Sequence, residues 1–512
     1  MVTTKDKVIL SEENLSIEDL VLVARFNVPL MLSDSLKKKI KQSRRVVEHF
    51  IKQEKVIYGI TTGVGDNSHI KINTTDAKKL QKNLIQSHAC GVGENLSIEL
   101  VRAVMVMMAR NLSLGYSGVR LEVIESVINL LNKQITPLVP QEGSLGYLSY
   151  QAHISLVLLG SGQAHYDGNV LDGGTALKKA GLQPIELHEK EGLSLINGTA
   201  DMTGLGAVAV YDSLNVLKAA DIVSMISFEA LRGTKYAFDP RISKVKPHPG
   251  QHKTIANLNK IIQDSEIAET FKNYRTQDAL SIRAIPQVHG ACKDAVHYTK
   301  QVIEREMNSA TDNPLVFDEE NGGVALSSAN CHGEPVAIAL DFLAISMSEI
   351  ANVGERRVFR LVSPQYSELP PFLVNNEGVN SGYMIPQYVA AALVSDNKVY
   401  AHPASVDSIP TTAGQEDHVS MGTSAALKVL KIMTNTERVI GIELMCSSQG
   451  IEFLEPLSPG VGTGVARDVL RRHTPTLHDD RILYEDIQKA EMLVHSGELV
   501  RKVEEKIGPL LV

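Results

Sequence analysis

Short motifs place polar and titratable side chains in loops rich in glycine, proline and asparagine, where proteins commonly carry their chemistry. Tyr58 opens one of them, the run YGITTGVG at residues 58–65. Its glycines allow a tight turn and the close approach of a ligand. A phosphate-binding loop would need a following Gly-Lys-Ser or Gly-Lys-Thr, which this run lacks, so the residues alone favour a plain turn.

Charged side chains mark two other segments. Arg283 stands in the mostly apolar stretch 279–288, which indicates a buried guanidinium that holds a carboxylate bidentately. The run QEDH at 415–418 gathers three titratable groups, but a metal site needs more ligands at a definite spacing, and none is evident. Taken one at a time, such groups are more often structural cations or the polar start of a helix.

Helical periodicity dominates the chain and predicts the elements that hold these loops. Ser16 and Asp19 form a capping pattern for a helix over 17–23. The stretch 205–231 is apolar almost all the way round and is followed by Gly233, as expected of a long buried helix. Further helices are expected at 334–350, 388–400 and, with an amphipathic pattern, 483–494.

Strand-like alternation is weak throughout the sequence. Short candidates are found at 56–58 and 324–326. No strand–helix alternation would build a doubly wound sheet, and no repeat of about 20 to 50 residues is present. We therefore predict a mainly α fold.

Composition limits the class of protein. The 512 residues carry 51 basic and 59 acidic side chains, a formal charge of −8, and 43% of them are hydrophobic. This balance argues against disorder and against a nucleic-acid binder, which needs a clustered basic surface. No stretch reaches the roughly 18 consecutive apolar residues of a membrane helix, and residues 1–25 lack the layout of a signal peptide. The four cysteines form no CxxC, so a cytoplasmic location is expected.

In their order along nearly the whole chain, the motifs resemble the histidine and phenylalanine ammonia-lyase superfamily. The matching segments are Tyr58-Gly59, Ser87-His88, Asn197-Gly198-Thr199, Arg283, Asn313-Pro314, His332-Gly333-Glu334-Pro335, Asp396-Asn397-Lys398 and the QEDH run at 415–418. The run AHPASVDSIP at 401–410 makes a chance match implausible. Ser87-His88 and QEDH are the forms typical of the histidine branch, and they imply a substrate with an imidazole-like ring.

The resemblance implies an ammonia-lyase/fumarase-like fold. Residues 1–200 would form a smaller N-terminal domain that carries the active-site loop and the cofactor-loop region. Residues 201–512 would form a long central helical bundle and the C-terminal helices. The family also implies a homotetramer with sites built from three subunits, a small-molecule substrate, and neither a metal ion nor a diffusible cofactor.

The chain departs from the family where the lyases make their electrophile. In the family pattern GSVGASGDLAPLAH, the Ala-Ser-Gly triplet cyclises and dehydrates to a methylidene-imidazolone. Here residues 143–153 read GSLGYLSYQAH, with six residues between the second glycine and the histidine where the family has nine. The difference matches the missing triplet, and no Ala-Ser-Gly occurs elsewhere in the chain.

Ring formation needs a serine followed by a flexible glycine, whose nitrogen attacks the preceding carbonyl. Ser149 lies instead between Leu148 and Tyr150, so we predict that no methylidene-imidazolone forms. Two smaller departures also indicate a remodelled site. Leu280 stands where the histidine branch has Tyr, and Cys331 where it has Phe.

Elimination without an electrophile requires a better leaving group than a primary amine. A quaternary trimethylammonium leaves as a neutral amine and has no lone pair to add to an electrophile. A histidine betaine therefore suits both the imidazole-type motifs and the missing triplet. The chain is in this respect similar to the ergothionases of the superfamily, which release trimethylamine from ergothioneine to give thiourocanate. The hypothesis is a cofactor-free 1,2-elimination that yields a urocanate-type acrylate.

The resemblance also implies the role of each residue. Tyr58, with its pKa lowered by nearby cations, would abstract the β-proton, and Arg283 would hold the substrate carboxylate. Lys398 or Glu416 would stabilise the charge that spreads into the ring. His88 would select that ring. The other expected substrate contacts are Asn197, Gln287, Asn313, Tyr147 and Tyr150.

Several alternatives stay open. Tyr147 and Tyr150 either surround a quaternary nitrogen by cation–π contact or merely fill the gap left by the triplet. A histidine ammonia-lyase acting on L-histidine would share the pocket but would need another way to activate the amine. A non-catalytic structural or binding relative has no chemical reason to keep a base, a carboxylate clamp and an acid together. An aminomutase would also rely on the missing electrophile and ranks last.

Overall fold

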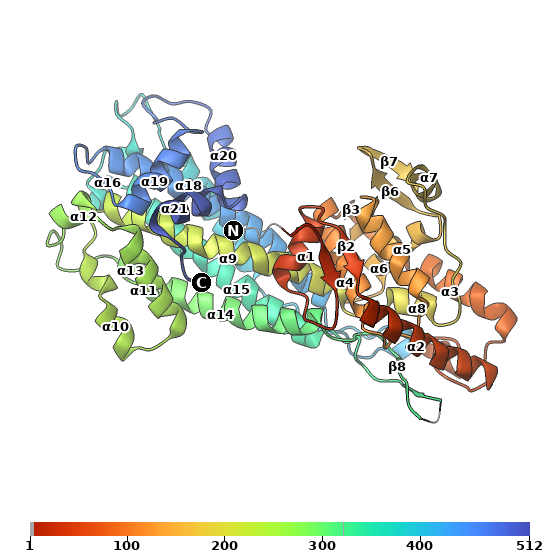
Figure 1. The fold of residues 1–512 in the computed structure, drawn as a ribbon. Helices are drawn as coiled ribbons and strands as arrows, with labels where there is room; N and C mark the ends of the chain where they lie inside the picture. The colour runs from red at the N-terminus through yellow and green to blue at the C-terminus, as the bar shows by residue number, and fades with distance from the viewer. Residues whose placement is uncertain (1–4, 321) are drawn as a thin grey trace.

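The structure is a computed structural model that describes residues 5–320 and 322–512. Helices dominate it, and the longest of them run side by side through the middle of the molecule (Figure 1). Smaller helices surround both ends of this bundle, and the strands lie at its right-hand end in Figure 1. The prediction of a mainly α fold is confirmed. Residues 1–4, the first part of the segment searched for a signal peptide, lie outside the described residues.

The helices of residues 17–196 are coloured red to yellow in Figure 1. They are α1 (Ile17–Ala24), α2 (Asp34–Lys52), the 3₁₀ helix η1 (Gly65–His69), α3 (Thr74–His88), α4 (Ile98–Ser113), α5 (Leu121–Asn132), α6 (Ser149–Leu158), α7 (Gly173–Lys179) and α8 (Glu191–Ile196).

The bundle helices and those that cover its far end follow in the second part of the chain. They are α9 (Ala200–Ala230), η2 (Lys235–Phe238), α10 (Pro240–Val245), α11 (Pro249–Ile261), α12 (Glu266–Thr270), α13 (Leu280–Arg283), α14 (Ile285–Met307), α15 (Glu334–Val362), α16 (Pro364–Ser367), η3 (Pro371–Leu373), α17 (Met384–Tyr400), η4 (Thr412–Gly414), α18 (Gly422–Glu452), α19 (Val461–Arg471), α20 (Tyr484–His495) and α21 (Glu498–Ile507).

Short strands form small sheets at the edges of the molecule. They are β1 (Val8–Leu10), β2 (Leu30–Leu32), β3 (Val92–Asn95), β4 (Thr136–Pro137), β5 (Pro140–Glu142), β6 (Gln163–Tyr166), β7 (Asn169–Asp172), β8 (Leu315–Phe317) and β9 (Val324–Leu326). β1 pairs in parallel with β2. The remaining pairs are antiparallel: β3 with β5, β4 with β6, β6 with β7, and β8 with β9.

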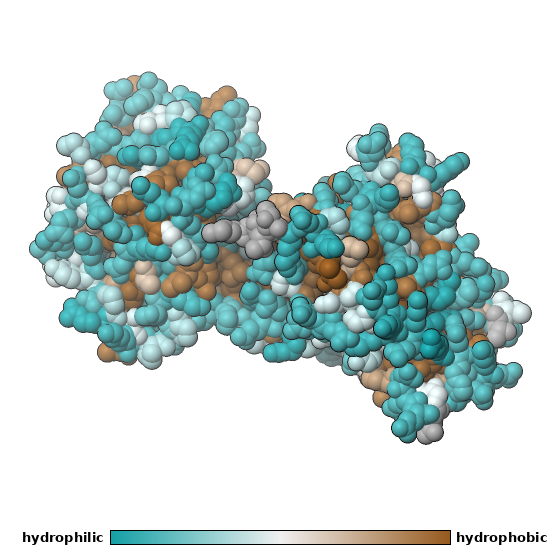
Figure 2. Space-filling view, in the orientation of Figure 1, coloured by the Kyte–Doolittle hydropathy of each residue, from teal (hydrophilic) through white to brown (hydrophobic). Residues whose placement is uncertain are grey.

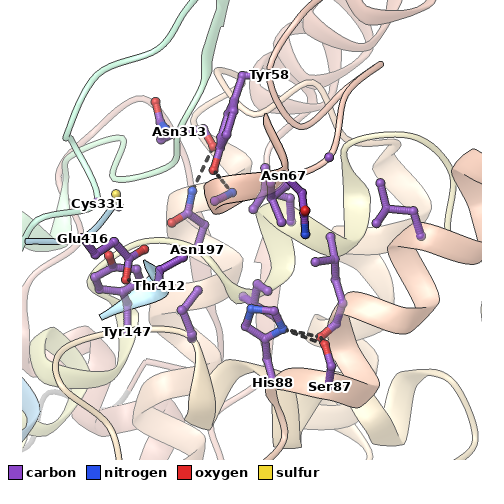
Figure 3. Close-up of a pocket in the computed structure, with 18 of the residues that line it drawn as sticks. Tyr58, Asn67, Ser87, His88, Tyr147, Asn197, Asn313, Cys331, Thr412 and Glu416 are labelled. Atoms are coloured by element: carbon purple, nitrogen blue, oxygen red, sulfur yellow. Dashed lines mark hydrogen bonds between the residues drawn. The ribbon is translucent and has the colours of Figure 1, made fainter. Parts of the chain in front are cut away.

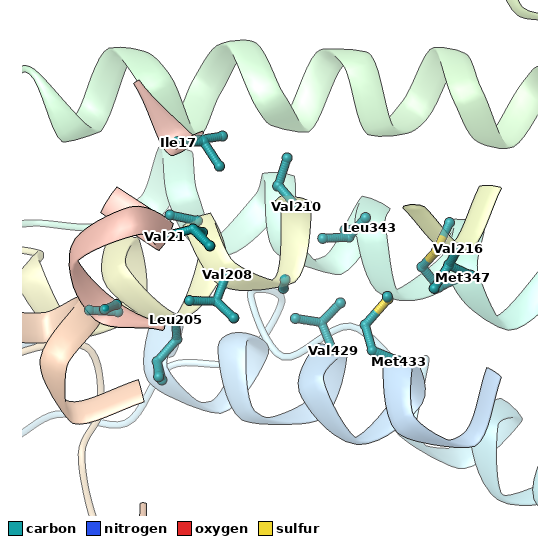
Figure 4. Close-up of a cluster of buried hydrophobic side chains, with 14 of the residues drawn as sticks. Ile17, Val21, Leu205, Val208, Val210, Val216, Leu343, Met347, Val429 and Met433 are labelled. Carbon is teal, nitrogen blue, oxygen red and sulfur yellow. The ribbon is translucent and has the colours of Figure 1, made fainter. Parts of the chain in front are cut away.

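Helix α9 is the centre of the bundle and packs against α4, α14, α15 and α18. Apolar side chains from three of these helices meet in the core shown in Figure 4, among them Val208, Met347 and Val429. Each is fully or almost fully buried. Burying a side chain of this size contributes about 1.5–3 kcal/mol, so packing rather than intrinsic helix propensity stabilises the bundle.

Several element predictions are confirmed. Helix α1 begins after Ser16, whose hydroxyl accepts the backbone N–H of Asp19. The buried helix expected at 205–231 is α9, which starts five residues earlier, at Ala200. The other expected helices correspond to α15, α17 and α20, and the strand at 324–326 is β9.

The strand expected at 56–58 is wrong. The Thr61 hydroxyl accepts the Ile57 N–H at 2.9 Å and donates to the Lys55 carbonyl at 2.6 Å. These bonds close the segment on itself, so its backbone groups are satisfied without a partner strand. The result is a turn that begins the glycine-rich loop.

Helix α15 is, among the described residues, the one helix long and apolar enough to cross a membrane. It packs against α14, α17 and α18, and 67% of its most apolar window is buried inside the protein. The bundle therefore accounts for its apolar sequence.

Part of α15 nevertheless faces outward. Ile338, Phe342 and Ile345 are 38%, 47% and 48% exposed and recur at helical spacing. Figure 2 shows apolar residues gathered along the bundle between the two wider ends of the molecule. Exposed apolar surface of this kind is a common feature of protein–protein interfaces.

Gly204 sets how closely α9 approaches α4. A Cβ atom there would lie 2.9 Å from the carbonyl carbon of Ala103 and from the nitrogen of Val104. Both are backbone atoms of α4, which cannot move aside alone. We expect Gly204→Ala to destabilise the fold by about 1–3 kcal/mol, measured as the midpoint of urea unfolding.

Gly464 in α19 is the matched control, because a Cβ there would meet only Pro459, at an ordinary 3.6 Å. Gly464→Ala should stabilise by about 0.5–1 kcal/mol through helix propensity. Equal effects of the two substitutions would show that the close crossing is not the reason for the glycine.

Candidate active site

A cavity of about 570 Å³ lies at the loop-rich end of the bundle (Figure 3). Its walls come from the glycine-rich loop with η1, the end of α3, the residues before α6, the end of α8, and loops before α15 and α18. A smaller cavity of about 310 Å³ adjoins it. The larger cavity brings together six of the ten predicted site residues: Tyr58, His88, Tyr147, Asn197, Asn313 and Glu416.

The glycine-rich loop positions Tyr58. Its phenol oxygen accepts the backbone N–H of Gly65 at 3.1 Å, across the loop. Gly59 has a φ of +66°, and a Cβ there would lie 2.3 Å from the Leu193 side chain of α8. Glycine is therefore required at this position by both conformation and space. The loop is not a phosphate cradle but a support for one tyrosine.

The surroundings of Tyr58 raise its pKa above the ordinary value. Burial is the main cause, and the charges of Glu416 and Cys331 add to it, while the Gly65 N–H opposes them. The expectation that nearby cations lower this pKa is wrong for the single chain, because its charged neighbours in the cavity are acidic. A base at this position needs positive charge from outside the described chain.

His88 ends α3 and extends toward the cavity in Figure 3. Its Nδ1 lies 2.8 Å from the Leu84 carbonyl oxygen and 3.1 Å from the Ser87 hydroxyl. Because a carbonyl oxygen only accepts, Nδ1 carries the proton, and neutral His88 presents an unprotonated Nε2. This atom can accept an N–H from an imidazole-like ring.

Two asparagines offer opposite polarity to the cavity. Nδ2 of Asn197 donates to Asp312 Oδ1 at 3.2 Å and to the Asn313 carbonyl at 2.9 Å, which leaves its Oδ1 as an acceptor. Oδ1 of Asn313 accepts the Ser328 N–H at 2.7 Å and the Ser327 hydroxyl at 3.3 Å, which leaves its Nδ2 as a donor. The pair can thus hold a cationic nitrogen and a carboxylate oxygen.

Tyr147 and Glu416 face each other on the opposite wall (Figure 3). Burial and the Glu416 charge hold the pKa of Tyr147 well above its ordinary value, so its phenol stays protonated. Oε2 of Glu416 accepts the hydroxyls of Thr411 and Thr412 at 3.2 and 3.1 Å. Burial likewise raises the pKa of the Cys331 thiol to about 11.

Asp201 anchors the segment that carries Tyr147. This fully buried carboxylate, in the first turn of α9, accepts the Ser144 hydroxyl at 3.1 Å and the Thr423 hydroxyl at 2.7 Å. Ser144 lies three residues before Tyr147, and Thr423 begins α18. One side chain therefore ties three parts of the chain together at the base of the cavity.

The segment that replaces the family's cofactor loop does not fit a methylidene-imidazolone. Ser149 is the first residue of α6, and Leu148 before it has a φ of +80°. Tyr150 after it is fully buried, and its hydroxyl donates to the Gln141 carbonyl. No glycine nitrogen follows the serine. The expected substrate contact of Tyr150 is also wrong, since this side chain fills the core behind the cavity.

Arg283, Gln287 and Lys398 are not brought to the cavity of their own chain. Arg283 ends α13 and Gln287 begins α14, at the end of the bundle opposite the cavity (Figure 1). Nε of Arg283 donates to the Asp278 carbonyl at 3.0 Å rather than to a carboxylate. Lys398 is exposed on α17. Their expected roles stay predictions.

His332, Glu334 and His418 lie close in sequence to the cavity residues Cys331 and Glu416. Their donor atoms lie within 4.8 Å of one another, so these side chains could hold a metal ion. Nε2 of His332 lies 3.1 Å from Nδ1 of His418, and the Glu334 N–H lies 3.4 Å from Nδ1 of His332. A neutral His332 therefore carries its proton on Nε2 and donates it to His418. The pair is satisfied without an ion, and the expected absence of a metal stays a prediction.

Sequence reasoning missed some residues of the cavity. Asn67 in η1 and Thr412 in η4 line it from segments whose polar residues carry no distinctive spacing. Cys331 also lines the cavity, and the sequence indicates this residue only through its departure from the family pattern. The polar groups behind the cavity wall, Lys190 and Asp312, give no signal at all in the sequence.

A bundle of long helices with a tyrosine, a histidine, paired amides and a carboxylate in one terminal cavity defines a lyase of the ammonia-lyase fold. The chain belongs to the aromatic amino acid lyase family, whose sequence profile matches residues 15–472. It is 47% identical to histidine ammonia-lyase of Alkaliphilus oremlandii over 504 residues, covering 98% of this chain and 99% of that protein. It is a carbon–nitrogen lyase of the histidine ammonia-lyase branch.

Solved structures confirm the expected fold. Histidine ammonia-lyase from Trypanosoma cruzi superposes with a TM-score of 0.92 at 38% identity, covering 98% of this chain and 96% of that one. The ergothioneine-degrading enzyme ergothionase from Treponema denticola, in complex with desmethyl-ergothioneine sulfonic acid, gives a TM-score of 0.91 at 26% identity, covering 97% and 100%.

Replacing Glu416 by Gln removes a negative charge beside Tyr58 with almost no change of shape. We expect the pKa of Tyr58 to fall, because the Glu416 charge is one of the causes that raise it. The measurement is the phenolate absorbance during alkaline titration, with Tyr58→Phe subtracted in each background. Glu269→Gln, in α12 at the other end of the bundle, is the control and should change nothing. An unchanged Tyr58 titration in Glu416→Gln would contradict the coupling.

Proposed function

We propose that the protein eliminates the α-nitrogen group of a histidine-like substrate and yields a urocanate-type acrylate. One observation carries this proposal: a phenol, an imidazole with a free acceptor nitrogen, two amides of opposite polarity and a carboxylate line the same cavity. The names of the relatives support the histidine-like class of substrate.

Each group in the cavity has a distinct role in the proposed elimination. Ionised Tyr58 takes the β-proton, the Cα–N bond breaks with its electron pair on nitrogen, and a double bond forms between Cα and Cβ. Nε2 of His88 accepts the ring N–H. Nδ2 of Asn313 donates to the substrate carboxylate, and Oδ1 of Asn197 faces the departing nitrogen. The Tyr147 phenol would stabilise the ring by donating a hydrogen bond as negative charge spreads into it, and Glu416 would do so in its protonated, acid form.

The leaving group has two candidates, each favoured by a different observation. Relatives at 47% identity are named histidine ammonia-lyase, which favours ammonia from L-histidine, whereas ergothionase is a 26% identical neighbour. The missing Ala-Ser-Gly triplet and the place of Tyr147 in the cavity wall favour trimethylamine from a betaine such as ergothioneine. A phenol can contact a quaternary nitrogen through its ring face.

A turnover assay with ergothioneine, histidine betaine and L-histidine tests the proposal. We expect the absorbance of a conjugated acrylate to rise and an amine to be released from a histidine-type substrate. Trimethylamine from a betaine, with histidine inert, would support elimination without the cofactor. Ammonia from histidine would support the alternative. No turnover of any of the three would contradict the proposed function.

The mass of the intact chain is the control for the cofactor. We propose that no ring forms, so the mass should equal that of the encoded sequence. A loss of two water molecules would show that a ring forms after all and would leave only the ammonia-lyase alternative.

We also propose that the working protein is a homotetramer whose cavities are completed by neighbouring subunits. Arg283, Gln287 and Lys398 lie outside the cavity of their own chain, and the exposed apolar face of α15 offers a contact surface. Arg283 from a neighbour would bind the substrate carboxylate and supply the positive charge that Tyr58 lacks. We also propose a cytoplasmic location. The four cysteines, which are all free thiols, suit a reducing compartment.

Mixing two inactive variants tests whether sites are shared. Tyr58→Phe and Arg283→Met should each lose nearly all turnover while their melting temperatures stay near that of the parent. Subunits exchanged at equal amounts should regain roughly a quarter of the parental turnover, because half the sites have Tyr58 and half of those have Arg283 from another chain.

Tyr236→Phe, an exposed tyrosine of η2, is the matched control and should keep full activity. A mixture that stays inactive although exchange is complete would show that both residues must come from one chain.

A further inference from the structure

A lysine and an aspartate form a fully buried ion pair directly behind the cavity wall. Nζ of Lys190 lies 2.7 Å from Oδ2 of Asp312 and 2.8 Å from the Ser194 hydroxyl. Both charged side chains are 0% exposed. Burial lowers the pKa of Lys190, and the Asp312 charge opposes that effect. Such pairs often contribute no more to stability than an apolar pair of the same volume. Stability alone therefore does not explain why this position holds an ion pair.

The backbone at Lys190 adds a second cost. It has a φ of +76° and immediately precedes the first residue of α8. A residue with a Cβ atom is strained in this left-handed region, where glycine is favoured. Both the backbone conformation and the burial of the charge are therefore unfavourable for a lysine at position 190.

Asp312 connects this lysine to the cavity. Its Oδ2 takes the ammonium, and its Oδ1 accepts Nδ2 of Asn197 at 3.2 Å and the Asn313 backbone N–H at 2.7 Å. Lys190 and Asn197 stand at the two ends of the short helix α8. One carboxylate therefore hydrogen-bonds residues at both ends of α8 and the backbone of Asn313.

We propose that Lys190 and Asp312 are positioning residues that favour the orientation in which Asn197 presents its oxygen to the substrate and that hold the backbone of Asn313 in place. A carboxylate paired with an ammonium accepts at both oxygens and donates at neither. Asn197 must then turn its NH₂ group inward and its oxygen toward the cavity. With a neutral group in place of Asp312, only the Asn313 carbonyl would hold this orientation, and the amide would reverse more readily and present a donor.

This inference rests on the proposed function, because the polarity matters for an elimination. An oxygen of Asn197 attracts a cationic nitrogen, whether ammonium or trimethylammonium, whereas a reversed amide would repel it. The same bonds hold the Asn313 backbone, so its Nδ2 keeps its place for the carboxylate. Misplacing groups by about 1 Å costs on the order of 10²-fold in rate.

The test compares two variants that remove the pair in different ways. Lys190→Met with Asp312→Asn leaves no unpaired buried charge and nearly the same volume. Lys190→Gly relieves the backbone strain but removes the ammonium. We expect both to lose on the order of 10²-fold in kcat/KM, mostly through kcat, and the double variant to keep its melting temperature within a few degrees of the parent.

The control is another ion pair that links distant elements, Lys218 and Glu504, with Nζ and Oε1 2.8 Å apart. Lys218→Met with Glu504→Gln should change stability alone and leave kcat and KM unaltered. If Lys190→Gly or the double variant turned over substrate like the parent, the lysine would serve only the backbone or the packing, and the proposal would be wrong.

A readout without turnover keeps the inference separate from the proposed function. Hydrogen exchange followed by mass spectrometry should show faster exchange at 191–197 and 311–317 in both variants, and no change there in the Lys218/Glu504 control. This holds even if the parent turns over none of the three substrates. Unchanged exchange at both segments would overturn the positioning role whatever the activity.

Discussion

A carboxylate buried away from water costs several kcal/mol unless donors satisfy its oxygens, and the cavity end of this bundle depends on two such groups. Asp201 joins the start of α9 to the segment before Tyr147 and to the start of α18. Asp312 joins both ends of α8 to the loop of Asn313. Segments more than a hundred residues apart are thereby held in one arrangement. Both groups therefore favour the arrangement in which their hydrogen bonds are satisfied.

The helices and the loops have separate tasks in this protein. The bundle around α9 supplies a closely packed frame, and the loops at its end supply one or two functional side chains each. The site is therefore sensitive to single residues in the loops, while the fold is set by many small apolar contacts. This separation is consistent with a TM-score of 0.92 to a relative that is only 38% identical in sequence.

Much of the fold could be predicted from the sequence, because a long apolar stretch such as 205–231 has few alternatives to a buried helix. The segment 56–58 could not be predicted, since the hydroxyl of Thr61, just after these strand-like residues, bonds back to their backbone and forms a turn. The cavity residues Tyr58, His88 and Asn197 were found through the family motifs rather than through their own spacing.

What the sequence could not reveal is the arrangement behind the cavity. Lys190 lies between two glutamates, and such a charged run is typical of a solvated surface, yet its side chain is completely buried. Nor could the sequence show that Tyr58 is surrounded by acidic groups, because Glu416 lies near the other end of the chain. Electrostatic environments depend on tertiary contacts, which periodicity does not encode.

The acidic surroundings of Tyr58 have a consequence for the timing of catalysis. Burial and the Glu416 charge raise the pKa of Tyr58 and so favour the protonated phenol. A substrate that carries its own positive nitrogen brings into the cavity the charge that favours the phenolate. Under the proposed mechanism, binding of the substrate and ionisation of Tyr58 are therefore linked, and a neutral molecule of the same shape would not favour the phenolate.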